Sequence, residues 1–156
     1  MTFLLAVFSV VLLASSARAG LLGPTKEELY NKQMTIQQEC SLQYNVPETY
    51  LKLVLEGGAT ESRKGKCFMK CGLVGMGYID GDGSLNEKNL RSIVYTYFDD
   101  KVQREFAIKS WKDCDKKCHS ESYTDDSCDR AFNIAKCFVQ QIQNSGFLSN
   151  YKLGGI

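Results

Sequence analysis

Histidine, tryptophan and proline are scarce in this sequence, with one, one and two copies among 156 residues. Nucleophilic catalysis needs a base held next to a nucleophile. The sole histidine, His119, is followed by Ser120, but the sequence lacks the His-Asp pair and adjacent cysteines that a secreted phospholipase would show. We therefore expect no enzymatic activity and no cofactor.

A marked net charge is also missing, because 19 basic residues stand against 18 acidic ones. A domain that binds nucleic acid or an anionic membrane surface usually carries a basic excess. Neither partner is therefore indicated. The sequence has no N-x-[ST] sequon either, so N-glycosylation is not expected.

One apolar run opens the chain, from Phe3 to Ala14, and no second stretch of this kind follows. The run is too short to cross a membrane. Ala17-Arg18-Ala19 after it has the small-x-small pattern of a cleavage site. We expect residues 1–19 to be a signal peptide and residues 20–156 to form one secreted domain, without membrane insertion.

Long alternating strand patterns and internal repeats are absent, and apolar residues recur every three or four positions. This periodicity predicts an all-α domain of about six helices, each with one apolar face. Thr25 and Glu28 form a capping-box pattern at the start of the first helix, which continues through Tyr30, Met34 and Cys40. Pro47 is placed to open a short second helix from Glu48 to Leu55.

The third helix carries Cys67 and Cys71 and is expected to stop within the glycine-rich segment from Gly72 to Gly83. Ser84 and Glu87 form a second capping-box pattern that predicts the start of the fourth helix. Asp99 and Asp100 are expected to cap a fifth helix, which Val102, Phe106 and Trp111 mark. A sixth helix is expected to begin at Thr124, Asp125 and Asp126 and to run from Cys128 to about Gln143.

Seven cysteines lie in the expected mature chain, and secretion favours disulfides over metal binding. Cys67 and Cys71 are one helical turn apart, too far for a direct disulfide, so they should bond to two other segments. Cys128 and Cys137 fall on opposite helix faces and must also reach different neighbours. Six cysteines would thus tie the first, third, fifth and sixth helices together, and one is left over.

The cysteine spacing resembles the six-cysteine signature of the insect odorant-binding proteins, whose x3 and x8 gaps are the most diagnostic parts. The order here is Cys40-x26-Cys67-x3-Cys71-x42-Cys114-x13-Cys128-x8-Cys137. Segments matching in style are Lys66 to Cys71, Met76 to Asp80, Cys128 to Phe132 and Lys136 to Phe138, and the resemblance spans roughly Thr25 to Gln143. It implies helices around a hydrophobic cavity and interlocked bridges Cys40–Cys71, Cys67–Cys128 and Cys114–Cys137.

The extra cysteine leaves two choices, because Cys114 and Cys118 are also four residues apart. Cys114 gives an x42 gap and Cys118 an x46 gap, and we favour Cys114 for the bridge to Cys137. A zinc site built from such x3 pairs with His119 is the weaker alternative. Residues from Asp80 to Leu85 resemble a calcium loop, but its first and twelfth positions are wrong, and a tight turn explains them better.

The resemblance implies a carrier of small apolar ligands such as odorants or pheromones, acting as a monomer or homodimer, with a chemosensory receptor as a further partner. A relative of the same fold with a salivary, reproductive, or lipid- or amine-scavenging role is the alternative. Aromatic and Met-rich helix faces suit an adaptable apolar cavity, although each position also suits an ordinary core. The expected lining residues are Phe68, Met69, Leu73, Met76, Val94, Tyr97, Phe98, Trp111, Phe132, Val139 and Phe147.

Overall fold

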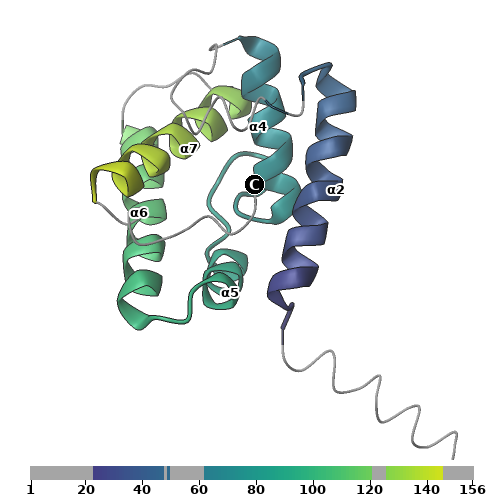
Figure 1. The fold of residues 1–156 in the computed structure, drawn as a ribbon. Coiled ribbons are helices and arrows are strands. Elements are labelled where there is room, and N and C mark those ends of the chain that lie inside the picture. The colour runs from purple at the N-terminus through teal and green to yellow at the C-terminus, as the bar shows by residue number, and fades with distance from the viewer. Residues whose placement is uncertain (1–22, 48, 50–61, 121–125, 146–156) are drawn as a thin grey trace, which may run out of the picture.

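The computed structural model describes residues 23–47, 49, 62–120 and 126–145. Within these residues the fold is all-α, as predicted, and Figure 1 shows α4 between α2 and α7. There are five described helices instead of six: α2 (Lys26–Tyr44), α4 (Arg63–Met76), α5 (Glu87–Tyr97), α6 (Lys101–Ser120) and α7 (Ser127–Asn144). The predicted signal peptide, the predicted helix from Glu48 to Leu55 and Phe147 lie outside the described residues.

Most of the predicted helix caps are confirmed. The backbone N–H of Thr25 donates to Glu28 Oε2 at 2.7 Å, and the Glu28 N–H donates back to Thr25 Oγ1 at 3.1 Å. The Asp100 carboxylate accepts from the Gln103 N–H at 2.9 Å at the start of α6. Asp126 accepts from the Cys128 N–H at 2.8 Å at the start of α7. These side chains satisfy N–H groups that have no partner inside the helix.

The predicted cap of α5 at Ser84 is wrong, because α5 begins two residues later. Asn86 is the N-cap, and its side chain accepts from the Asn89 N–H at 3.0 Å. Ser84 lies instead in a tight turn, where its carbonyl accepts from the Asp80 N–H at 2.8 Å and its hydroxyl donates to Asp82. The backbone at Ser84 is therefore engaged in the turn before the helix starts, and the segment that resembled a calcium loop is this turn.

The prediction of one apolar face per helix fails for α2. Only Leu29 and Cys40 are buried on this helix, whereas Tyr30 and Met34 are 46% and 47% exposed. The cause is position, because α2 lies at the edge of the helix assembly and packs mainly along α4 (Figure 1). On α6, Val102 is likewise 72% exposed and does not belong to the apolar face that Trp111 marks.

Most of the buried side chains of the described residues form two clusters. The first lies between α2, α4 and α7 and contains Cys40, Val46, Phe68, Met69, Phe132 and Ala135. The second lies between α5, α6 and α7 and contains Leu90, Val94, Ala107, Ile108, Trp111, Cys114, Cys118 and Ile134. Leu73 of α4 packs against both clusters and so connects them.

Three disulfides fasten four of the helices, with the pairing that the resemblance implied. They join α2 to α4, α4 to α7 and α6 to α7 through Cys40–Cys71, Cys67–Cys128 and Cys114–Cys137. The choice of Cys114 is confirmed, and Cys118 is buried in the second cluster outside these bridges. In the described part of the chain, no three His, Cys, Asp or Glu side chains gather as a metal site would require.

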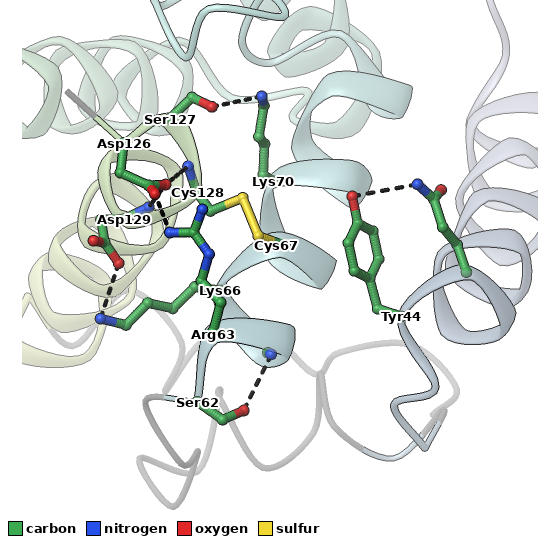
Figure 2. Close-up of a disulfide and its surroundings, with 12 residues drawn as sticks. Tyr44, Ser62, Arg63, Lys66, Cys67, Lys70, Asp126, Ser127, Cys128 and Asp129 are labelled. Carbon is green, nitrogen blue, oxygen red and sulfur yellow. Dashed lines mark hydrogen bonds and ion pairs between the residues drawn. A yellow bond between two sulfur atoms is a disulfide. The ribbon is translucent and has the colours of Figure 1, made fainter.

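Polar contacts reinforce the bridge between α4 and α7. Figure 2 shows the Cys67–Cys128 disulfide with side chains of both helices around it. Arg63 pairs with Asp126, Lys66 Nζ lies 3.0 Å from Asp129 Oδ1, and Lys70 Nζ donates to Ser127 Oγ at 2.6 Å. The N-terminal half of α4 and the first turn of α7 are therefore held together by covalent, ionic and hydrogen bonds. None of the described helices is long and apolar enough to cross a membrane.

Candidate ligand-binding pocket

A pocket of about 160 Å³ lies between α2 and α4 and is partly open to solvent. Its walls come from three pieces of structure: the middle of α2, α4 from Phe68 to Met76, and Tyr78, which lies two residues after the end of α4. The lining residues are Gln33, Ile36, Gln37, Phe68, Met69, Gly72, Leu73, Met76 and Tyr78. Most of these side chains are apolar, and the two glutamines share one helix.

The α4 wall follows from helical periodicity. Phe68, Met69, Leu73 and Met76 recur at the three- and four-residue spacing that places side chains on one face of a helix. Gly72 lies among them, and a Cβ added there would meet nothing within 4 Å. The missing side chain at Gly72 is therefore part of the space that the pocket encloses.

The two helices approach closely beside the pocket. A Cβ added at Gly75 would lie 2.7 Å from Ile36 Cγ2, closer than real Cβ atoms come to other atoms. The Cys40–Cys71 disulfide joins the same helices near this point, with 5.8 Å between the two Cα atoms. The bridge and the glycine together fix the distance between the walls.

Tyr78 closes the pocket where α4 ends. Gly77 adopts a left-handed conformation with φ of 84°, and its N–H and that of Tyr78 both donate to Leu73 O. The Tyr78 carbonyl accepts from the Asn86 N–H at 2.9 Å, which fixes the backbone on the other side. The ring stacks on Trp111 at 4.9 Å between centroids, and Trp111 stacks on Phe138 at 4.4 Å.

Two tyrosines contribute to the polar part of the pocket: Tyr78 lines it, and Tyr97 reaches it through Gln33. The Tyr97 hydroxyl of α5 donates to Gln33 Oε1 at 3.4 Å. Desolvation by the surrounding protein raises the pKa of the Tyr78 phenol above its usual value, and the nearby Tyr97 raises it further. Tyr78 therefore carries its proton at any physiological pH.

The structure brings four of the eleven predicted lining residues to this pocket: Phe68, Met69, Leu73 and Met76. Val94 and Trp111 belong to the second core cluster, which Phe98 flanks, and Phe132 belongs to the first. Tyr97 reaches the pocket only through Gln33, Val139 is half-buried on α7, and Phe147 lies outside the described residues. Direct ligand contact by any of them stays a prediction.

Five lining residues escaped the sequence reasoning: Gln33, Ile36, Gln37, Gly72 and Tyr78. That reasoning selected large apolar and aromatic side chains on strongly amphipathic helices, whereas α2 has a weak apolar pattern. The one available signal was the glycine at position 72, which interrupts an otherwise bulky face of α4.

Residues 23–141 match the model of the PBP/GOBP family. The solved structures with a similar fold include pheromone-binding protein 3 of Epiphyas postvittana, with a TM-score of 0.60 and 21% identity over 71% of this chain and 96% of that one. An odorant-binding protein of Drosophila melanogaster aligns with a TM-score of 0.58 and 20% identity over 77% of this chain and 97% of that one. No curated protein matches significantly. The helical fold, the three bridges and the match over most of the chain together show that it belongs to the PBP/GOBP family, the insect pheromone- and odorant-binding proteins.

Proposed function

We propose that this protein is a secreted carrier that binds small hydrophobic molecules, such as odorants or pheromones, in the pocket between α2 and α4. The observation that carries the proposal is the apolar wall of this pocket, built from Phe68, Met69, Leu73 and Met76. Transfer of an apolar ligand from water to such a wall is favourable by about 25 cal/mol for each Å² buried. Binding then needs neither a covalent step nor a cofactor.

The pocket volume indicates the size of the ligand. Cavities of about 150 Å³ lined by apolar side chains accept benzene, whereas sites for drug-sized ligands span roughly 300–1,000 Å³. At about 160 Å³, the pocket suits one ring with short substituents. Met69 and Met76 have flexible, polarisable side chains that can adapt to differently shaped ligands.

The disulfides support a carrier role mechanically. A cavity forgoes contacts that an ordinary core would make, and so costs stability. The Cys40–Cys71 bridge joins the two helices that form the walls, so they cannot separate without breaking a covalent bond. The two walls of the pocket therefore stay together whether or not a ligand is bound.

Displacement of a fluorescent apolar probe such as N-phenyl-1-naphthylamine tests the proposal. Gly72→Leu places a side chain into the open space of the pocket, so probe affinity should fall by roughly tenfold or more. Gly81→Leu is the matched control, because a Cβ there also meets nothing within 4 Å but the residue lies in the exposed turn. Its affinity should equal that of the original sequence.

Two results would contradict the proposal. The first is a protein that binds neither the probe nor any apolar ligand, and the second is equal binding by the Gly72→Leu variant. Secretion is tested by expressing all 156 residues in insect cells. We expect the protein in the medium with Gly20 as its first residue, and retention in the cells with residues 1–19 still attached would contradict this part.

A further inference from the structure

The Tyr78 hydroxyl is a polar group in an apolar surrounding. Among the described residues it has no hydrogen-bond partner, although its backbone N–H and carbonyl are both bonded. Tyr78 as a residue is half-buried, and it lines the pocket. A hydroxyl in this position can donate to a molecule that enters the pocket.

The position of Tyr78 leaves the hydroxyl little freedom. Hydrogen bonds to Leu73 and from Asn86 fix its backbone, and stacking on Trp111, with 14° between the rings, fixes its side chain. The Tyr97 hydroxyl lies near enough to interact electrostatically with Tyr78, and it donates to Gln33, another residue that lines the pocket. The backbone and the ring of Tyr78 are therefore held in place in the pocket wall before a ligand arrives.

We propose that Tyr78 Oη donates a hydrogen bond to the ligand, and that the preferred ligand is a small apolar molecule with one carbonyl oxygen: an aldehyde, a ketone or an ester. The proposal rests on the carrier function above and adds the chemical class of the ligand.

A carbonyl fits this site better than an alcohol or a hydrocarbon does. A carbonyl oxygen needs a donor and brings none of its own. An alcohol brings an O–H that needs an acceptor as well, and the Tyr97 hydroxyl already takes one of the two lone pairs of Gln33 Oε1. A hydrocarbon would cover the Tyr78 hydroxyl without a hydrogen bond, and burying a polar group in that way is unfavourable.

The test compares two ligands of the same shape, acetophenone and α-methylstyrene, in which a CH₂ group replaces the carbonyl oxygen. Tyr78→Phe removes only the hydroxyl. It should weaken acetophenone binding by about 2- to 12-fold, the range for one net hydrogen bond, and leave α-methylstyrene binding unchanged or stronger, because no hydroxyl is then covered without a partner. Tyr30→Phe is the control, because Tyr30 lies on α2 but is 46% exposed and does not line the pocket. It should change neither affinity.

The infrared stretch of the bound carbonyl gives an independent reading. In the original protein it should lie at a lower frequency than in hydrocarbon solvent, and it should return to the solvent value in Tyr78→Phe. Equal effects of Tyr78→Phe on both ligands, or a stretch in the original protein at the hydrocarbon value, would overturn the inference. The second measurement needs no variant and so holds even if Tyr78→Phe fails to fold. Failure of the carrier function itself would look different, since neither ligand would then bind the original protein.

Discussion

Gly75 provides the sharpest test of how α2 and α4 pack. An alanine methyl group at this position would lie 2.7, 3.1 and 3.2 Å from Cγ2, Cδ1 and Cγ1 of Ile36. Ile36 is β-branched and has a restricted χ1 angle within a helix, so it cannot turn aside freely. The Cys40–Cys71 disulfide prevents the two helices from moving apart at this level.

Two opposing effects decide the magnitude for Gly75→Ala. Alanine is favoured over glycine inside a helix by about 0.5–1 kcal/mol, while overpacking a close contact costs about 1–3 kcal/mol. The net change should lie between about zero and about 2.5 kcal/mol of destabilisation by the same principles. Gly72→Ala in the same helix gains the helix preference without the clash, because its Cβ meets nothing within 4 Å. It should stabilise the protein by about 0.5–1 kcal/mol.

Urea denaturation with the disulfides intact, followed by circular dichroism, measures both free energies of unfolding. The difference between the two variants removes the common helix preference and isolates the contact with Ile36. We expect a difference of about 1–3 kcal/mol in favour of Gly72→Ala. Equal stability of the two variants would refute the close packing of α2 on α4, and with it the position of one wall of the pocket.

Three further predictions concern the caps and the bridges. The hydrogen bond from Arg63 and its charge lower the pKa of Asp126 from its usual 3.8. Asp126→Asn can still cap α7 but loses this ion pair, so the variant should be less stable than the original protein at pH 7. In acid denaturation curves, the difference in stability between the two proteins should disappear as the pH falls below 3.8 through the lowered pKa. A difference that stays constant with pH would contradict the ion pair. Cys114→Ala should abolish the Cys114–Cys137 bridge and lower the free energy of unfolding by about 2–5 kcal/mol, whereas Cys118→Ala should keep all three bridges. A Cys118 disulfide in peptide maps of the original protein would contradict this. Asn86→Ala removes an N-cap and should lower the stability measured by thermal unfolding by about 0.5–2 kcal/mol, and Ser84→Ala should lower it clearly less. The reverse order would mean that Ser84 is the cap after all.

Short-range signals in the sequence predicted the helices well. Thr25, Asp100 and Asp126 cap the helices that they were expected to cap, because a cap depends on residues only two or three positions away. The prediction of Ser84 as a cap failed because it depends on residues farther away along the chain. The pairing of Ile79 with Leu85 engages the chain around Ser84, so the helix starts at the next suitable side chain, Asn86.

The pocket was predicted less well than the fold, because its walls depend on how two helices cross. Phe68 and Met76 lie on the strong apolar face of α4, which the sequence pattern identifies. Trp111 also has a large apolar side chain on a helix, but it lies in the second core cluster and stacks on Tyr78. No local pattern separates a side chain that faces a cavity from one that faces another side chain. Gln33 and Ile36 became lining residues only because Gly75 lets α2 come close.

The stack of Tyr78 on Trp111 also makes the protein its own optical sensor. Trp111 is the single tryptophan of the chain and is 5% exposed, so all indole emission comes from one enclosed ring. One face of this ring touches the tyrosine that lines the pocket, and the indole also stacks on Phe138 of α7. Occupation of the pocket is thereby transmitted to a chromophore that the ligand need not touch. Titration of the unlabelled protein can report binding through the intensity and wavelength of its own fluorescence.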